Sequence, residues 1–383
     1  MRRSRNWLRL AMPFAAMALG TLPARAQSAA PPAAASQTGG YTRLATIAVP
    51  NMPLKAVDFG FLDPLLQLYY ITDRSNAGVD VIDALHNRFL VRITGNAAVG
   101  QFAGAQSNLE TSGPNAVASA EFGRLWASDG DSTIKIIDLF RLRVIKSVST
   151  GGTARVDGIT YDPRDHILIA SNNADTPPFV TLISTRPGQE RVLARITFET
   201  ALNGVEGLVY NPANGLFYVS LPQLGADQTK GGIAVIDPVS AKVVTTFPTS
   251  NCQGAGLALG PRRNLLLGCA LANTAAVTPL ATQVIDDFSG AVTATIPQVS
   301  GSDQVSYDPA NQTYYLAARD NPGGSVLGVI DARTNAFVGN VPTGKGAHSV
   351  ASDPLNNHVF VPLPPNPADA ACVNGCIGVY GLH

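Results

Sequence analysis

Residues 329–364 read VIDARTNAFVGNVPTGKGAHSVASDPLNNHVFVPLP. This stretch contains a strand ending in Ile-Asp, a turn, a second strand, a Pro-x-Gly segment, a short strand ending in Asp-Pro, and a further strand. Asp-Pro favours a turn because proline fixes φ and the aspartate side chain caps the bend. The order therefore predicts short strands joined by tight turns.

Two landmarks of this stretch recur along the chain. The first is an apolar strand ending in Ile-Asp, with copies at Val81-Ile82-Asp83, Ile136-Ile137-Asp138, Val235-Ile236-Asp237 and Val284-Ile285-Asp286. Weaker copies are Leu182-Ile183-Ser184 and Val379-Tyr380-Gly381. The second is a short strand closed by a turn dipeptide, as in GITYDP (158–163), GLVYNP (207–212), GLALGP (256–261), QVSYDP (304–309) and SVASDP (349–354).

The first residues of these short strands define the repeat. Aligning them gives seven starts, which are Lys55, Asn115, Asp157, Glu206, Ala255, Asp303 and His348. The first step, from Lys55 to Asn115, is 60 residues long, and the other five are within the ~40–50 residues of a propeller blade. Each unit contains four short strands, so the sequence predicts an all-β fold, a seven-bladed β-propeller.

The two ends of the repeat region complement each other. The seventh unit stops after its third strand, CIGVYG (376–381), whereas the strand TRLATIAVP (42–50) precedes the first unit and belongs to none. We expect this N-terminal strand to complete the last blade, because closure removes exposed sheet edges. The alternative, an open solenoid, leaves both edges unpaired.

The repeats resemble those of the YVTN family of β-propellers. Residues 329–364 follow the family's order of strands and turns, and Tyr70-Ile71-Thr72-Asp73 is close to its signature tetrapeptide. Other blades depart from it, as in Trp126-Ala127-Ser128-Asp129. The resemblance covers about residues 41–383 and implies the propeller fold. It implies little about function, because such propellers serve as binding platforms, surface proteins and enzymes.

The N-terminus has the pattern of a targeting segment. Arg2, Arg3 and Arg5 precede a largely apolar stretch over 10–22, and Ala24-Arg25-Ala26 fits a cleavage site. We expect a signal peptide over 1–26, a flexible leader over 27–40 and the propeller over 41–383. An uncleaved anchor is the alternative. No later stretch is apolar enough to cross a membrane. From the targeting pattern we expect a periplasmic or secreted protein, and we expect it to be a monomer.

Four cysteines in an exported chain predict two disulfides. Cys252 precedes the first strand of blade five and Cys269 ends its second strand, which brings them to the same face. Cys372 and Cys376 flank a short Val-Asn-Gly loop. A redox or metal role for this second pair is the alternative.

The seven strand starts should form a ring at the mouth of the central channel. All but Ala255 are polar, and the loops after the second strands add residues such as Asn172 and Arg319. One interpretation is simple hydration of the channel mouth. The other is a ligand site, with Lys55, Asn115, Asn172 and Arg319 as ligand-binding residues.

The same ring contains candidates for a cation site and for catalysis. Asp157, Glu206 and Asp303 supply the hard oxygen donors that Ca²⁺ or another divalent cation prefers. His348 is the one histidine expected at this mouth and is a candidate general base. The long connection over 95–114 reaches the same face, where it is either a binding loop or a disordered insertion.

Three functions follow from this pattern. The leading one is binding of a small molecule or protein partner at the channel face, with or without a divalent cation. The second is a metal-dependent lactonase-like hydrolase or lyase, because the ring is similar in architecture and residue type to calcium-dependent lactonases of the gluconolactonase group, which have six blades. The third is a protein-interaction scaffold.

Other functions are disfavoured by composition and motifs. The formal net charge is zero, which gives no electrostatic footprint for nucleic acid. The sequence has no Walker A loop, no G-x-S-x-G elbow, no H-E-x-x-H motif and no Cys-x-x-Cys-His haem attachment site. We therefore expect neither a nucleotide nor haem.

Overall fold

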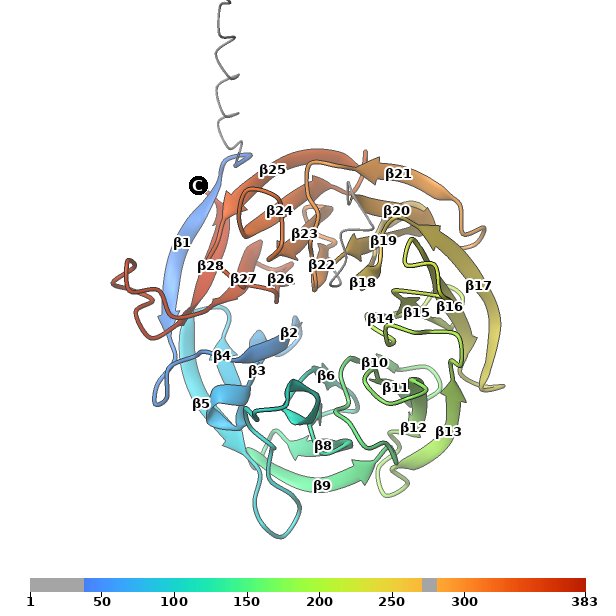
Figure 1. Ribbon diagram of the computed structural model, residues 1–383. Coiled ribbons are helices and arrows are strands. Elements are labelled where there is room, and N and C mark those ends of the chain that lie inside the picture. Colours follow the sequence, from blue (N-terminus) through green and yellow to red (C-terminus); the bar gives the residue numbers. More distant parts are fainter. Residues whose placement is uncertain (1–37, 271–280) are drawn as a thin grey trace, which may run out of the picture. The chain divides into compact units, whose positions relative to one another are not determined.

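The computed structural model describes residues 38–270 and 281–383. These residues form seven four-stranded antiparallel sheets, with no α-helix among them. The sheets are arranged around a common centre as a seven-bladed β-propeller (Figure 1). This arrangement confirms the predicted fold class and the number of blades.

In each blade, the four strands lie side by side and are named below in order from the centre of the ring outward. Blades one and two contain β2 (Val57–Asp63), β3 (Leu68–Asp73), β4 (Gly78–Asp83), β5 (Arg88–Thr94), β6 (Val117–Ser119), β7 (Arg124–Ser128), β8 (Thr133–Asp138) and β9 (Arg143–Ser149). Blades three and four contain β10 (Ile159–Asp162), β11 (Ile167–Asn172), β12 (Phe179–Ser184), β13 (Arg191–Thr197), β14 (Leu208–Asn211), β15 (Leu216–Leu221), β16 (Lys230–Asp237) and β17 (Lys242–Ser250).

The remaining blades follow the same order. Blades five and six contain β18 (Gly254–Leu259), β19 (Asn264–Cys269), β20 (Thr282–Asp286), β21 (Val292–Ile296), β22 (Val305–Asp308), β23 (Thr313–Ala318), β24 (Val326–Asp331) and β25 (Ala336–Pro342). Blade seven contains β26 (Ala351–Asp353), β27 (His358–Leu363), β28 (Cys376–Leu382) and β1 (Tyr41–Ala48).

The N-terminal strand β1 closes the ring. It pairs antiparallel with β28, in a register that runs from Tyr41 opposite Leu382 to Ala48 opposite Cys376. The Tyr41 hydroxyl also lies 3.0 Å from the hydroxyl of Tyr315 in blade six. The closure predicted from the missing fourth strand is therefore confirmed.

The core consists of hydrophobic clusters between neighbouring blades. Between blades seven and one, for example, Ile47, Leu54 and Ile377 are buried together, and the rings of Tyr69 and Phe360 stack with centroids 5.0 Å apart. Each sheet thus buries both faces against its neighbours, which explains why its inner strands are apolar on both sides.

The inner strands begin later than the sequence predicts. Five of the seven expected starts lie two residues before their strand, His348 lies three before β26, and Ala255 lies inside β18. In blade three, the Asp157 N–H still donates to Ser171 O, but the next N–H, that of Gly158, donates to the Ser171 hydroxyl instead. The hydroxyl interrupts the ladder, so the predicted start Asp157 lies in the incoming loop, two residues before β10.

The same hydroxyl position links neighbouring blades. Ser128 accepts from the Ala116 N–H at 2.8 Å and donates to Asp157 O, in the next blade, at 2.7 Å. Ser220 likewise donates to Gly254 O at 2.7 Å. The loops at the channel mouth are therefore held by hydrogen bonds between blades, which fixes the positions of the side chains that they carry.

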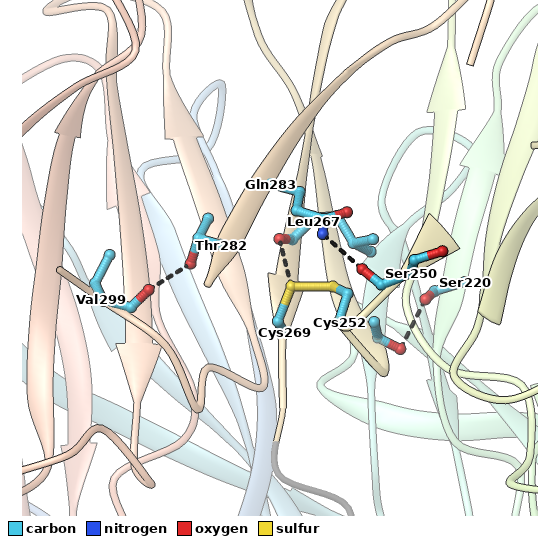
Figure 2. Close-up of a disulfide and its surroundings, with 9 residues drawn as sticks. Ser220, Ser250, Cys252, Leu267, Cys269, Thr282, Gln283 and Val299 are labelled. Atoms are coloured by element: carbon cyan, nitrogen blue, oxygen red, sulfur yellow. Dashed lines mark hydrogen bonds between the residues drawn. A yellow bond between two sulfur atoms is a disulfide. The ribbon is translucent and has the colours of Figure 1, made fainter. Parts of the chain in front are cut away.

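Both predicted cysteine pairs lie at disulfide distance. The Cα atoms of Cys252 and Cys269 are 4.7 Å apart, and this pair connects the loop before β18 with the end of β19 (Figure 2). The Cα atoms of Cys372 and Cys376 are 5.0 Å apart, and Cys376 is the first residue of β28. Such pairs are compatible with an extracellular protein.

The predicted signal peptide over 1–26 lies outside the described residues, as does most of the leader over 27–40. Nowhere in residues 38–270 or 281–383 does the chain form a helix with the length and hydropathy that a membrane crossing requires.

Candidate functional site

A cavity of about 380 Å³ opens at the centre of the ring, among the loops that lead into the inner strands. Its charged and titratable lining residues are Lys55, Asp58, Arg74, Arg155, Asp157, Glu206, Asp303, Arg319 and His348. Apolar side chains, including Leu54, Phe59, Leu109, Pro222 and Leu363, complete the wall. We call this space the central cavity.

Six of the eight sequence-predicted ligand, metal and catalytic residues line the central cavity, namely Lys55, Asp157, Glu206, Asp303, Arg319 and His348. The structure therefore brings together residues from the first, third, fourth, sixth and seventh blades. Their roles in binding or catalysis stay predictions, but their common location is now established.

The two predicted asparagines hold neighbouring side chains in place. Asn115 Oδ1 accepts from Arg74 Nε at 2.9 Å, and its Nδ2 donates to Val156 O at 2.8 Å. Asn172 Nδ2 donates to Ser132 Oγ at 2.9 Å and to Asp175 Oδ2 at 3.1 Å. Asn115 thus orients Arg74, which does line the central cavity, and Asn172 fixes the loop that follows β11.

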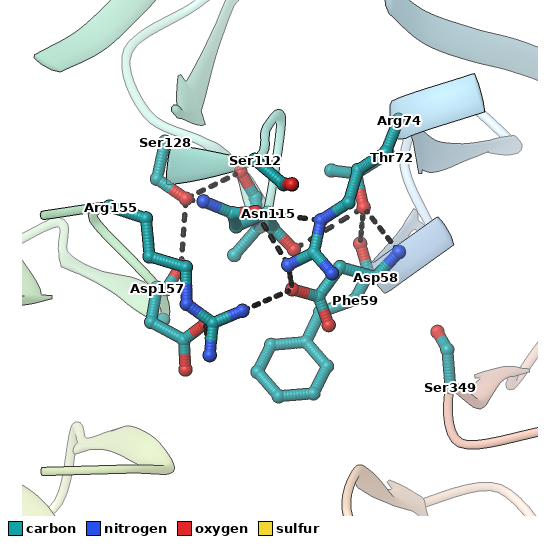
Figure 3. Close-up of polar contacts among 12 residues, drawn as sticks. Asp58, Phe59, Thr72, Arg74, Ser112, Asn115, Ser128, Arg155, Asp157 and Ser349 are labelled. Carbon is teal, nitrogen blue, oxygen red and sulfur yellow. Dashed lines mark hydrogen bonds and ion pairs between the residues drawn. The ribbon is translucent and has the colours of Figure 1, made fainter. Parts of the chain in front are cut away.

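Asp58 is the centre of a buried charge cluster (Figure 3). It forms an ion pair with Arg74, the first residue of the short 3₁₀ turn over Arg74–Asn76. A second guanidinium, that of Arg155, lies 3.8 Å from Asp58 Oδ2. Burial opposes the ionised form of Asp58, but Arg74, His348 and Arg155 outweigh burial and lower its pKa. Asp58 is therefore a carboxylate at neutral pH.

Arg155 differs from Arg74 because its side chain is poorly satisfied. Its Nε lies 3.2 Å from Glu110 Oε2, and its Nη2 lies 3.4 Å from Asp157 Oδ1. The side chain is only 12% exposed, yet within the described residues Nε has no acceptor in hydrogen-bonding geometry, and Glu110 Oε2 has no donor. Burial lowers the pKa of Arg155, but Asp157, Asp58 and Glu110 outweigh burial and raise it, so the charge is permanent.

Two of the cavity carboxyls hold their protons unusually strongly. Burial raises the pKa of Asp157 to about 6, with the repulsion of Asp58 adding to the effect and Arg155 opposing it. Burial, together with repulsion from Asp157 and Asp303, raises the pKa of Glu206 well above its ordinary value. The four carboxyls therefore carry less than four negative charges, and the central cavity has a positive balance.

His348 is held so that both ring nitrogens face acceptors. Its Nδ1 lies 2.9 Å from Gly346 O, and its Nε2 lies 3.5 Å from Asp58 Oδ1. Burial lowers the pKa of His348, but the contact with Asp58 and the charge of Asp303 outweigh burial and raise it. This arrangement favours the imidazolium, whereas a general base needs a free lone pair.

The expected metal donors are not gathered into one cluster. Asp303 Oδ2 lies 2.9 Å from Arg319 Nη1, and Asp157 lies beside Arg155. In the part of the chain that the structure describes, no group of three His, Cys, Asp or Glu side chains is close enough to hold a metal ion. A guanidinium beside each aspartate competes with a cation for the same oxygens.

The connection over 95–114 is folded against this face. It contains a 3₁₀ turn over Leu109–Thr111. Leu109 lines the central cavity, and Glu110 accepts from the Arg155 N–H through its carbonyl at 2.7 Å. Phe102, by contrast, is 5% exposed and packs between blades one and two. Only the end of the segment therefore reaches the central cavity, and its role as a binding loop stays a prediction.

Sequence reasoning missed Asp58 and Arg155 as site residues. Arg155 lies two residues before the ring position Asp157, and Asp58 lies three after Lys55. A signal was present, because both are charged residues within three positions of an expected inner-strand start. An alignment of only the first residue of each expected inner strand does not include Asp58 or Arg155.

No protein-family model matches the chain, and no curated protein matches it in sequence. Solved structures match it in fold. A chain of the mitotic checkpoint complex superposes with a TM-score of 0.64 and 11% identity, over 96% of this chain and 99% of that one. A chain of hydrazine synthase from Kuenenia stuttgartiensis superposes with a TM-score of 0.65 and 16% identity, over 87% and 96%. Such identities show a shared propeller fold alone, and the YVTN resemblance remains unconfirmed.

Proposed function

We propose that this protein binds a small anionic ligand in the central cavity, with Arg155 as the principal anchor. The observation that carries the proposal is the buried Arg155 guanidinium, whose Nε has no hydrogen-bond acceptor within the described residues. Buried donors in proteins are nearly always hydrogen-bonded, and leaving one unpaired costs about 1–3 kcal/mol. A ligand whose oxygen accepts a hydrogen bond from Arg155 Nε recovers that free energy.

A carboxylate is the anion that fits best. A guanidinium presents parallel N–H donors that match the two oxygens of a carboxylate. Arg319 and Lys55 border the same space and add positive charge, while Leu54, Phe59 and Leu109 offer apolar contact. A volume of about 380 Å³ is within the range of small-molecule sites. The supported ligand is thus a small carboxylate with a short apolar body.

The hydrolase or lyase alternative has less support. It needs a base and, in its lactonase form, a metal. His348 faces acceptors with both ring nitrogens, and arginines lie beside Asp157 and Asp303. Binding without turnover needs neither a general base nor a metal.

The protein is proposed to work outside the cytoplasm as a monomer. The signal-peptide pattern at 1–26 supports export. The two cysteine pairs at disulfide distance support an oxidising compartment, which for this chain means the periplasm or the exterior.

Calorimetric titration with pentanoate tests the proposal. We expect saturable binding to the wild type and a dissociation constant raised about 10- to 100-fold in Arg155→Gln, the loss typical of a charge-assisted hydrogen bond. Arg333→Gln is the matched control, because Arg333 is an exposed arginine paired with Asp331 in the turn between β24 and β25. Its affinity should equal that of the wild type.

Two results would overturn the proposal. One is no saturable binding of any carboxylate from acetate to octanoate, and the other is equal affinity in Arg155→Gln. Titrations with EDTA and with added CaCl2 complete the experiment, and we expect equal affinities. A strict requirement for Ca²⁺ would instead support the cation site.

A further inference from the structure

A second cavity, of about 490 Å³, adjoins the central one. Its walls come from residues 173–178, which connect β11 and β12, from the loop before β14, and from Glu110. Arg155, Asn203 and Glu206 line both cavities. The two spaces therefore share a wall, and a ligand held by Arg155 lies at their boundary. We call the second space the outer cavity.

The outer cavity has the opposite charge balance. It is lined by the carboxyl groups of Glu110, Asp175, Glu199 and Glu206, and its one cationic lining residue is Arg155, at the shared wall. Asp175 accepts from the Thr153 N–H at 2.7 Å and from Asn172 Nδ2 at 3.1 Å, and it has no cationic partner within the described residues. Cationic groups thus prevail on one side of Arg155 and carboxyl groups on the other.

An unsatisfied acceptor supports a ligand in the outer cavity independently of its charge. Asn173 lines this cavity and is 9% exposed, and its Oδ1 has no donor among the described residues. Glu110 Oε2, which also lines this cavity, lies 3.2 Å from Arg155 Nε but accepts no hydrogen bond there. Buried oxygens without donors are rare in proteins, so a ligand with N–H groups would satisfy them.

We propose that the central and outer cavities form one elongated site for a zwitterionic ligand, with its carboxylate at Arg155 and its ammonium group in the outer cavity. This inference rests on the proposed function and specifies its ligand class. An ammonium group supplies three N–H donors and a positive charge. A linear amino carboxylate, with an apolar chain between its two charged ends, combines these groups in one molecule.

The charge arrangement also determines what the site rejects. A second carboxylate in the outer cavity would face like charges and leave the Asn173 and Glu110 oxygens without donors. A monocarboxylate bound at Arg155 has no group in the outer cavity, which then contains only water. The expected order of affinity is amino carboxylate, then monocarboxylate of equal length, then dicarboxylate.

A series of ligands tests this order by calorimetry at neutral pH and low salt. The probes are pentanoate, hexanoate and octanoate, their ω-amino derivatives, and adipate. At the best chain length, we expect the amino derivative to bind at least about five-fold more tightly than the monocarboxylate. Added salt should reduce this gain, because Glu199 and Asp175 are not fully buried.

The variant Glu199→Gln locates the ammonium group. Glu199 is exposed at the edge of the outer cavity and does not line the central one. Its loss should reduce the gain from the amino group about two- to five-fold and leave the affinity for pentanoate unchanged. Asp165→Asn is the control, because Asp165 pairs with Arg164 in the turn between β10 and β11, outside both cavities, and it should change neither value.

The outcomes separate this inference from the proposed function. If pentanoate binds through Arg155 but no amino derivative binds more tightly, the zwitterion site is wrong and the anion site stands. If the gain exists but is equal in Glu199→Gln, the ammonium group does not occupy the outer cavity, and the inference is also wrong. If no carboxylate binds, both fail.

Discussion

Titration of Asp157 makes the net charge of the central cavity depend on pH. Burial raises its pKa to about 6, and its carboxyl lies 3.4 Å from Arg155 Nη2. As the pH falls through this value, Asp157 gains a proton and the cavity loses one negative charge. His348, whose pKa is also raised, becomes protonated in the same direction. Both changes make the cavity more attractive to an anion.

We therefore expect pentanoate to bind more tightly at about pH 5.5 than at about pH 7.5, where the probe itself stays ionised. The gain should be about three- to ten-fold, the size of a partly screened charge interaction. Asp157→Asn should bind with nearly the low-pH affinity at both values, apart from the share due to His348. Calorimetry at the two pH values measures this, and an equally steep dependence in Asp157→Asn would contradict it.

The sequence identified the location of the site better than its working residues. Lys55, Asp157, Glu206, Asp303 and His348 are found at the channel mouth because the repeat places equivalent positions around one axis. Arg155 and Asp58 lie outside that set of equivalent positions. Their place in the site depends on the ion pair between them and on the Arg155 Nε that has no hydrogen-bond acceptor in the described residues. Asn115, at an equivalent position, does not line the cavity, but its Oδ1 accepts a hydrogen bond from Arg74 Nε, and Arg74 does line it.

The bounds of the inner strands are also only partly predictable from the sequence. Their existence follows from the turn dipeptides, but their first residues depend on hydroxyl groups in the second strand. Ser128 and Ser171 each take an N–H that a regular ladder would pair with a carbonyl. Such a substitution of one acceptor for another has no signature in hydrophobic periodicity, so six of the seven starts, all but Ala255, are predicted too early.

The two disulfides should differ in their contribution to stability. Cys252 and Cys269 are 17 residues apart and connect the loop before β18 with the end of β19, whereas Cys372 and Cys376 are 4 apart and close the loop that leads into β28. A longer closed loop restricts the unfolded chain more. We expect the double variant Cys252→Ala with Cys269→Ala to lose about 3 kcal/mol of unfolding free energy, and the Cys372→Ala, Cys376→Ala variant to lose less.

Urea unfolding of the two double variants and of the wild type measures this difference. The reduced wild type is the control, and it should unfold at or below the urea concentration of the less stable variant. A larger loss in the Cys372, Cys376 variant would mean that the short loop before β28 matters more to the closing blade than its length implies.

Closure is the property of the whole molecule that the sequence predicts most directly. It follows from counting, because the last repeat lacks one strand and one strand precedes the first repeat. The contacts that make closure stable were not predictable. Tyr41 reaches Tyr315 in blade six, and Ile47 packs with Leu54 and Phe360 between blades seven and one. The strand β1 therefore contacts both neighbours of the blade that it completes.

A chain that begins at Val49 lacks β1 and leaves the outer edge of β28 unpaired. Tyr41 and Ile47 are 5% and 3% exposed in the closed ring. Loss of their burial should reduce the unfolding free energy by at least about 3 kcal/mol. The exposed edge should also promote association between copies. Thermal melting and size-exclusion chromatography measure the two effects.

Adding β1 back as a peptide distinguishes closure from a general loss of stability. The peptide YTRLATIAVP (41–50) should bind the shortened chain, raise its melting temperature and restore the monomer, because the β28 edge and the pockets for Tyr41 and Ile47 remain. The same peptide with Tyr41→Ser and Ile47→Ser should do neither, since it keeps the backbone donors but loses the buried side chains. If the shortened chain melts at the wild-type temperature, or if it is folded and ignores the peptide, β1 does not hold the ring closed. Rescue by both peptides would assign closure to the backbone pairing with β28 rather than to the side chains that join three blades.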